Sequence, residues 1–383
     1  MAPTVSEAPA GFDGQTNGLV PQIQHDLDRD TFNEQESIAD GLGPVYNAQS
    51  CAECHQTPVT GGISQITELR AGRIQGHTFV NPPGGSLIND RAIDARIQER
   101  VPDGYDVQTF RTSLNTLGDG FVEAIADSTL IAIANAQAAL PNSRIGGQVI
   151  MVPISEAPGQ HRVGRFGWKN QHASLISFSA DAYLNEMGIT SPLQPTENTS
   201  NSNSVADFDT VPDPEDTGGL FGKDVEAFAQ FMRATKVPPR DAARAATLDA
   251  QIGSTLFDRV GCNICHVRNI ATAPAGTPLN GGTFVVPAAL GDKIIHPFSD
   301  FLLHDLETGD GIVQNGGDST RNKLRTPPLW GVRTRGRLMH DGASMTFREA
   351  ILRHEGEAEQ VIRRFRFLSN KEEQQLLAFL SSL

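Results

Sequence analysis

The sequence predicts a mainly α-helical fold in which two similar compact units are joined by long irregular loops. A five-residue pattern, Cys-x-x-Cys-His, occurs at Cys51–His55 and again at Cys262–His266, and these two copies contain all 4 cysteines of the chain. Helical periodicity is clear around the second copy, whereas segments rich in Gly, Pro and Asn interrupt much of the rest. The 383 residues suffice for two domains of ordinary size.

Composition excludes two classes of partner. The chain has 45 acidic residues against 31 Lys and Arg, for a net charge of -14. Such a balance offers no basic face to a phosphate backbone, so we expect no nucleic acid, whereas a basic protein partner is compatible with it. The most apolar stretch, near Leu130–Leu140, is interrupted by Asn135 and Gln137 and is too short for a membrane span.

Residues 1–45 are polar and predict an irregular N-terminal lead-in. The run Asp26–Asp30 begins like a calcium-binding loop, but Thr31 and Ser37 occupy the positions where an EF-hand has glycine and glutamate. We therefore expect a solvated acidic turn here, with an irregular calcium site as the alternative.

Residues 46–190 hold the first Cys-x-x-Cys-His among turns and helical stretches. Residues 191–219 are nearly devoid of apolar side chains and predict an exposed linker. The spacing of Val225, Phe228 and Met232 then predicts a helix over about 224–235.

Residues 220–383 contain the second motif between two predicted helices. Asp241 is a suitable N-cap, and Leu248, Ile252 and Leu256 form an apolar stripe that leads to Cys262. Near the other end, a capping box at Ser369–Glu372 precedes a leucine-rich helix.

Cys-x-x-Cys-His is the attachment signature of c-type haem, in which two thioethers hold the porphyrin and the histidine binds the iron. Four thiols on one zinc ion would leave both histidines unexplained, and a redox dithiol needs only one pair. We therefore predict two covalent haems and a mainly α fold with two cytochrome c-like haem domains, 46–190 and 220–383, and long irregular loops. The attaching and ligating residues are Cys51, Cys54, His55, Cys262, Cys265 and His266.

This chemistry also predicts a compartment. Covalent haem attachment of this kind takes place outside the bacterial cytoplasm, so we expect a periplasmic or otherwise extracytoplasmic protein. Residues Met1–Thr4 have neither the charged nor the apolar region of a signal peptide, which suggests a form without one.

The second haem has a candidate sixth ligand. A capping box at Thr346–Glu349 starts a short helix whose stripe contains Phe347, Ala350, Ile351 and His354. A histidine on this buried stripe, in the same domain as a haem with a free position, favours His354 as the ligand. Met339 and Met345 in the preceding loop are the alternatives.

Several motifs together resemble the di-haem c-type oxidoreductases, a family similar to bacterial di-haem cytochrome c peroxidases and to the di-haem enzymes that mature methylamine dehydrogenase. Besides the two Cys-x-x-Cys-His units, these motifs are Gly164–Lys169, Arg325–Gly331, Met339–Gly342 and Glu349–His354. In the peroxidases, the sixth ligand of the C-terminal haem follows the His-Asp-Gly turn by fourteen residues. Counting from His340, the resemblance also points to His354, although the peroxidases usually have Met there.

The resemblance further implies an electron-transfer path between the haems and a catalytic acid at the first haem. Trp168 matches a tryptophan that lies between the haems, and Glu186 matches the catalytic glutamate of the first haem, where a carboxyl can move a proton on bound peroxide. Phe178 replaces the glutamine of the family pattern, which implies a drier pocket and either slow peroxide turnover or O2 as the oxidant.

There are three options for the sixth ligand of the first haem: His77, His172 or no protein ligand at all. His77 lies in a glycine-bounded loop like the one that supplies a detachable histidine in the peroxidases, and His172 fits better near Trp168. Arg325 and His340 are candidates for hydrogen bonds to haem propionates.

The leading expectation is an enzyme of the peroxidase type that reduces hydrogen peroxide or activates O2. Electrons would come from a small redox protein, a cytochrome or a cupredoxin, and enter at the C-terminal haem. A non-catalytic electron-transfer cytochrome and a haem-based sensor are the alternatives from other classes.

Overall fold

The computed structural model describes residues 5–141, 144–213 and 218–383, so Met1–Thr4 and part of the expected linker lie outside the described residues. The chain is 32% helical and 16% strand, and the strands form many small sheets. The prediction of a mainly α fold with two cytochrome c-like domains is therefore wrong. The architecture is mixed, with short helices and short strands between long connections.

The α-helices are α1 (Gln22–Asn33), α2 (Cys51–Cys54), α3 (Asp119–Glu123), α4 (Asp127–Ala138), α5 (Leu175–Met187), α6 (Lys223–Ala234), α7 (Ala242–Ala245), α8 (Leu248–Val260), α9 (Phe347–Leu352), α10 (Glu359–Arg366) and α11 (Asn370–Leu380). Short 3-10 turns include η4 (Cys262–Ile264) and η7 (Val332–Thr334).

The strands are β1 (Ser6–Glu7), β2 (Val45–Tyr46), β3 (Thr67–Gln75), β4 (Thr78–Val80), β5 (Leu87–Ile88), β6 (Arg91–Ala92), β7 (Val107–Thr112), β8 (Met151–Pro153), β9 (His161–Val163), β10 (Ile270–Ala271), β11 (Pro278–Leu279), β12 (Phe284–Val285), β13 (Lys293–Ile295), β14 (Leu303–Asp305) and β15 (Lys323–Arg325). The largest sheet contains β4, β3, β5 and β7, with β3 antiparallel to each of the others.

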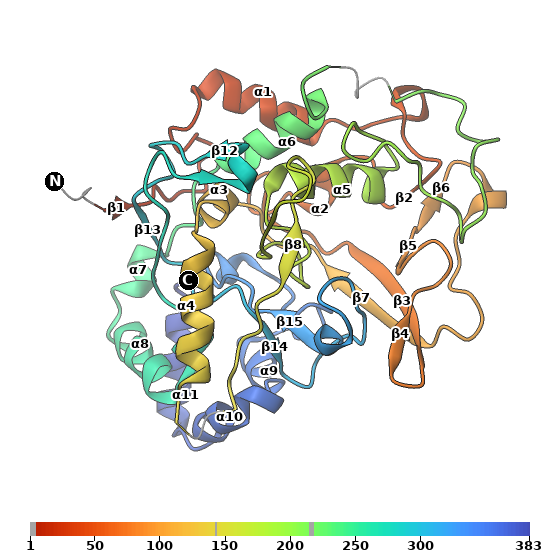
Figure 1. Cartoon of the computed structure of the whole chain (residues 1–383). Helices are drawn as coiled ribbons and strands as arrows, with labels where there is room; N and C mark the ends of the chain where they lie inside the picture. The colour runs from red at the N-terminus through yellow and green to blue at the C-terminus, as the bar shows by residue number, and fades with distance from the viewer. Residues whose placement is uncertain (1–4, 142–143, 214–217) are drawn as a thin grey trace.

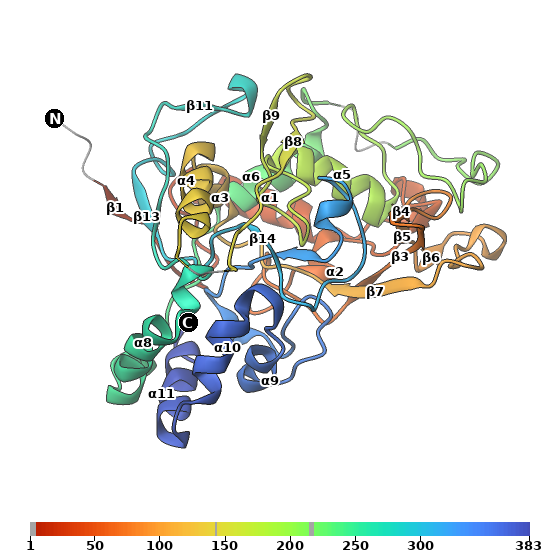
Figure 2. The ribbon, with the colours of Figure 1, turned by 60° about the horizontal axis from the view of Figure 1, so that its bottom comes forward.

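The helices gather at two ends of the molecule. Helix α6 packs against α1 and α5 at one end, and α8 packs against α11 at the other, near α9 and α10 (Figure 1). The view in Figure 2 shows the same two groups, with the β3–β7 sheet to one side. The first Cys-x-x-Cys-His begins in α2 at the α1–α5–α6 end, and the second follows α8 at the opposite end.

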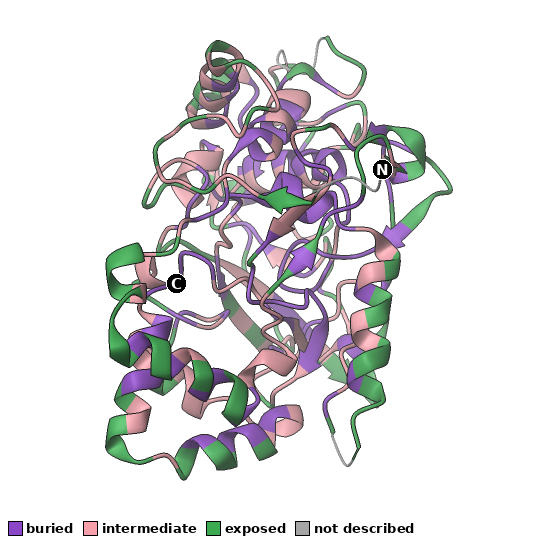
Figure 3. Ribbon diagram, turned by 90° about the vertical axis from the view of Figure 1, so that its left-hand side faces the viewer, coloured by how far each residue is buried: buried purple, intermediate pink, exposed green. Residues whose placement is uncertain are grey.

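Each helical end has its own hydrophobic core. One cluster joins α1, α3, α5 and α6 with the segments from 270 to 302, and the other joins α8, α10 and α11. Each helix around the second cluster carries both buried and exposed residues, as an amphipathic helix on a protein surface does (Figure 3). The division into domains at 190 and 220 stays a prediction.

Local helix signals predict some elements and miss others. Helix α6 and the capping boxes of α9 and α11 are confirmed. The expected stripe of α8 is wrong at two of three positions, because Leu248 and Ile252 are exposed and only Leu256 is buried. The buried face of α8 passes instead through Gly253, where a Cβ would lie 1.9 Å from the Gln375 carbonyl oxygen of α11.

The acidic turn expected at Asp26–Asp30 is also wrong, because these residues lie inside α1. Asp26 pairs with Arg29 at 2.8 Å, and Asp28 accepts hydrogen bonds from Gln24 and Gln230. An EF-hand takes its ligands from a loop, so this helical segment is not an EF-hand, and the irregular calcium site stays a prediction. In the described part of the chain, none of the helices combines the length and the apolar character needed to cross a bilayer.

Candidate functional site

The first Cys-x-x-Cys-His lines a cavity between four helices, α1, α2, α5 and α6. Ser50 caps α2, and Cys51, Cys54 and His55 face the cavity from it. Helices α5 and α6 form the opposite wall, which is apolar apart from Ser179 and one acid, Glu186; the wall comprises Phe178, Ser179, Ala182, Glu186, Met187, Phe228 and Met232. The structure thus brings the predicted acid and the predicted first haem motif together.

His55 is oriented for metal binding. Its Nδ1 lies 3.3 Å from the carbonyl oxygen of Gly62, which can accept the ring N–H and leave Nε2 as the free lone pair. Burial lowers the pKa of His55, so its ring is neutral near physiological pH. A neutral imidazole is the form that binds iron.

Glu186 is held at the end of α5 by the segment that leads into α2. Its carboxyl accepts a hydrogen bond from Asn47 Nδ2 at 2.8 Å, and its carbonyl oxygen accepts the N–H groups of Asn47 and Ala48 at 2.7 and 3.0 Å. Gly188 ends α5 with φ 70°, and a Cβ there would lie 2.7 Å from the Val45 carbonyl oxygen. Only glycine lets the two segments approach this closely.

The surroundings of the Glu186 carboxyl favour its protonated form. Burial and the nearby Glu68 carboxylate raise the pKa of Glu186 to about 8, against the opposing effect of Arg70. A carboxylic acid beside a candidate iron site can donate a proton to a reacting oxygen.

Neither histidine considered for the far side of the first haem reaches this cavity. His77 lies at the exposed turn between β3 and β4, where its carbonyl oxygen accepts a bond from Arg321. His172 stacks on Phe178 with ring centres 5.3 Å apart, and its Nε2 lies 3.2 Å from Asp181. Phe178 thus stands between His172 and the cavity that it lines.

The second Cys-x-x-Cys-His lines a larger cavity at the α8–α11 end. His266 and His354 face each other across it, with ring centres 6.4 Å apart. This separation would suit two imidazoles that bind one haem iron from opposite sides. The Nδ1 atoms lie 3.0 and 2.8 Å from the carbonyl oxygens of Phe298 and Ala350, so both Nε2 lone pairs remain available.

The protonation and the competing ligands agree with this pairing. Burial and the neighbouring His354 lower the pKa of His266 to about 4, and burial lowers the pKa of His354. Met345 is 59% exposed, whereas Met339 lines the same cavity and stays the alternative ligand.

Arginine and histidine side chains in the wall of this cavity are suited to hydrogen-bond the propionates of a haem. Arg325 and His340, the candidate propionate donors, both line the cavity; Arg325 Nε donates to the Gly167 carbonyl at 2.9 Å, and His340 Nδ1 is buried and has no hydrogen-bond partner among the described residues. Sequence reasoning missed Arg335, which lines the same cavity with an unpaired, buried Nε. Burial lowers the pKa of Arg335 to about 10, and a carboxylate ligand would satisfy such a charge.

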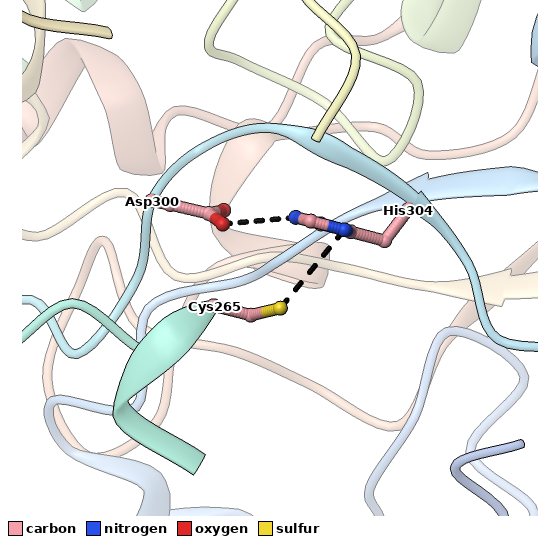
Figure 4. A group of neighbouring side chains, drawn as sticks. All are labelled: Cys265, Asp300 and His304. Atoms are coloured by element: carbon pink, nitrogen blue, oxygen red, sulfur yellow. Dashed lines mark hydrogen bonds and ion pairs between the residues drawn. The ribbon is translucent and has the colours of Figure 1, made fainter. Parts of the chain in front are cut away.

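Cys265, Asp300 and His304 have the donor types of a separate metal site (Figure 4). However, the His304 ring nitrogens lie 2.9 Å from Asp300 and 2.7 Å from Glu357. Burial alone would lower the pKa of His304, but Asp300 raises it well above its usual value. This favours the form in which both ring nitrogens carry protons, and that form cannot bind a metal. Cys265 also belongs to the haem motif, and we assign no further metal here.

Trp168 lies in the wall of the second cavity. Its indole N–H donates to the carbonyl oxygen of Thr112 at 2.8 Å, and its ring packs edge-on against His340. Four residues beyond Thr112, Thr116 lines the first cavity. One short segment therefore connects the walls of the two cavities.

The two cavities define a protein with two haem-type sites, each with cysteines and an oriented histidine, one with a facing second histidine and the other with an acid. Residues 93–383 match the family described as "Di-haem oxidoreductase, putative peroxidase". The chain belongs to this di-haem oxidoreductase family, and its cofactors are haems. The match includes Trp168, Glu186, the second Cys-x-x-Cys-His and His354, whereas Cys51–His55 precedes it.

Two solved structures show weak similarity over the whole chain. Hydrazine synthase from Kuenenia stuttgartiensis has 15% identity and a TM-score of 0.44, covering 100% of this chain and 96% of that one. A MauG-like protein associated with microbial copper homeostasis has 14% identity and a TM-score of 0.44, covering 100% and 94%. No curated protein sequence matches significantly.

Proposed function

We propose that this chain reduces hydrogen peroxide, or activates O2, at the site of His55, with electrons supplied through the site of His266 and His354. The observation that carries the proposal is the position of Glu186, a protonated carboxyl in the wall of the cavity that contains His55. A covalently bound haem with an open iron position would supply the binding and reduction of the oxidant there.

The residues of the first cavity suit proton delivery to a leaving oxygen. Reduction of H2O2 to two water molecules breaks the O–O bond and consumes two electrons and two protons. Glu186 can give its proton to the departing oxygen, which then leaves as water rather than hydroxide. The phenyl rings of Phe178 and Phe228 exclude water from this wall and so strengthen the interaction of Glu186 with the reacting oxygen.

Trp168 supports an electron connection between the two sites. It lies in the wall of the His266–His354 cavity and is bonded to Thr112, whose segment continues to Thr116 in the wall of the other cavity. We propose that electrons enter at the C-terminal site from a small redox protein, a cytochrome or a cupredoxin. Covalent haem attachment also favours a periplasmic or otherwise extracytoplasmic location.

The test combines spectroscopy with one variant. In oxidised protein, low-temperature electron paramagnetic resonance should show a high-spin ferric signal from the His55 site that changes on addition of peroxide. Glu186→Gln should lower peroxide turnover by ~10² or more, because the amide cannot donate a carboxylic proton. Turnover of the unchanged protein should fall as the pH rises through about 8, since Glu186 then loses its proton.

Glu99→Gln is the matched control. Glu99 is also buried and hydrogen-bonded, to the backbone N–H groups of Asn89 and Asn201, but it lies outside the cavity. Its variant should keep full turnover. Two low-spin signals that ignore peroxide, with equal turnover in Glu186→Gln and the parent, would favour an electron-transfer cytochrome or a sensor instead.

A further inference from the structure

A second glutamate lies behind Glu186, on the side away from the cavity. Glu68 belongs to β3, and its carboxyl is an electrostatic neighbour of the Glu186 carboxyl, close enough for the two to share a hydrogen bond. Two carboxylates cannot stay at hydrogen-bonding distance when both are charged, because their charges repel. The contact itself therefore requires one shared proton.

The surroundings decide which carboxyl carries that proton. Arg70 donates two hydrogen bonds to the Glu68 carboxylate, from Nε to Oε1 at 2.9 Å and from Nη2 to Oε2 at 3.0 Å. Arg111 Nη1 lies 3.6 Å from the same Oε1. A carboxyl between two guanidinium groups stays ionised. Glu186 receives a neutral donor instead, the Asn47 amide, so the proton lies on Glu186.

The β-sheet builds this arrangement. Glu68 and Arg70 are two residues apart on β3 and point to the same face, and Arg111 is the direct partner of Glu68 on β7. Arg111 is itself fixed by Asp310, which accepts from its Nε at 2.7 Å. Rigid backbone pairing thus holds the Glu68 carboxylate against Glu186.

Glu68 is partly exposed to solvent. Its side chain is 20% exposed and that of Arg70 is 13% exposed, whereas Glu186 lines the interior cavity. The pair therefore has one carboxyl in the wall of the cavity, at Glu186, and one partly exposed carboxyl outside that wall, at Glu68.

We propose that Glu68 is a positioning residue that keeps Glu186 protonated and restores its proton after each transfer. This inference rests on the proposed function. When Glu186 gives its proton to the leaving oxygen, the O–O bond breaks, water forms, and two adjacent carboxylates remain. Their repulsion drives Glu186 to take up one proton from solvent, which returns the pair to its starting state.

Other groups that face Glu186 act in known directions. Arg70 on β3 opposes protonation of Glu186, as does the Asn47 amide from the segment before α2. Cys54 of α2 also lies within electrostatic range of Glu186. Among these neighbours Glu68 is the anion that favours the protonated form, so its removal has a defined sign.

The test follows the Glu186 proton directly, without peroxide. In the oxidised holoprotein, infrared difference spectra between pH ~5 and ~10 report the carbonyl stretch of a protonated carboxyl, and its loss in Glu186→Gln assigns the band. Glu68→Gln should lower the midpoint of this band by about one pH unit or more, because an anion is removed and two arginines are left facing Glu186. Glu68→Asp, which keeps the charge, should restore much of the shift.

Glu123→Gln is the control for the loss of a buried ion pair. Glu123 is held by Arg233 through two bonds of 2.6 and 2.9 Å, as Glu68 is held by Arg70, but it lies outside the cavity of Glu186. This variant should leave the midpoint in place, and thermal unfolding of all variants shows whether each one folds.

The outcomes separate the inference from the proposed function. An unchanged midpoint in folded Glu68→Gln, or no rescue by Glu68→Asp, overturns the role of Glu68 whatever the turnover. A shifted midpoint in a protein that does not consume peroxide leaves the carboxyl pair established and contradicts the peroxide reaction. If the carboxyl pair and the peroxide reaction are both correct, turnover of Glu68→Gln is lost at a lower pH than turnover of the parent protein.

Discussion

At the residue scale, the chemistry of the two sites depends on which ring nitrogen of each histidine is free. In His55, His266 and His354 a backbone carbonyl lies beside Nδ1, at 3.3, 3.0 and 2.8 Å. The second cavity then offers two imidazoles, whereas the first offers one imidazole and a carboxylic acid. Two imidazoles give a low-potential six-coordinate iron, which suits electron transfer better than binding of an oxidant.

This assignment predicts the effect of replacing His354. His354→Met should raise the reduction potential of the C-terminal haem by on the order of 0.1 V, a fraction of the ~0.8 V over which axial ligands set haem potentials. A thioether stabilises the reduced iron relative to an imidazole. Optical titration against electrode potential measures the change.

His296→Met provides the control for a histidine-to-methionine change. His296 is exposed, with hydrogen bonds to Asn269 and Glu7, and lies outside both cavities. Its variant should leave both potentials in place. An unchanged potential and spectrum in His354→Met would show that His354 does not bind the iron.

Short-range residue patterns were readable from the sequence, and long-range partners were not. The cysteine motifs need only adjacent residues, and His354 was found because one helical stripe contains it with Phe347. Arg335 was missed because nothing near it in the sequence distinguishes it from Arg333 and Arg337. Its signature, a buried guanidinium without a protein acid, exists only in the fold.

At the element scale, the end of α5 sets the position of Glu186. Gly188→Ala should destabilise the protein by ~2–4 kcal/mol, because alanine is strained at φ 70° and its Cβ would meet the Val45 carbonyl oxygen at 2.7 Å. Chemical denaturation followed by circular dichroism measures the free energy of unfolding.

Gly76→Ala separates backbone strain from the close contact. Gly76 also has a positive φ, 65°, but a Cβ there would meet nothing within 4 Å. This variant should cost only ~1 kcal/mol. Equal losses of stability in the two variants would contradict the claim that α5 is packed tightly against the segment before α2.

The elements that the sequence predicts are those whose signals are local. The capping boxes of α9 and α11 and the stripe of α6 involve residues within two turns, and all three are confirmed. Strand β3 was missed because its pairing with β7 joins residues about forty positions apart and its two ends are polar. The mixed fold class could not be seen for the same reason, since most strands have only two or three residues.

At the scale of the whole molecule, the distribution of charge determines which redox proteins are attracted to the second cavity. The end that holds the second cavity is rich in arginine, including Arg348, Arg363 and Arg366 around α9 and α10. Each of these pairs with a glutamate, at 2.8, 3.0 and 2.9 Å. Because these three arginines are neutralised locally, we expect the net charge of -14 to dominate the long-range field.

A basic donor should therefore reduce the protein fastest at low salt. Raising the ionic strength from ~0.01 to ~0.15 M shortens the Debye length from ~30 to ~8 Å, and the rate with a basic cytochrome should fall by on the order of 10-fold. Stopped-flow absorbance of haem reduction measures this rate, and an uncharged small reductant should show no such dependence. A rate that increases with salt would mean that the donor is acidic and that the arginines around α9 and α10, rather than the net charge, guide it to the second cavity.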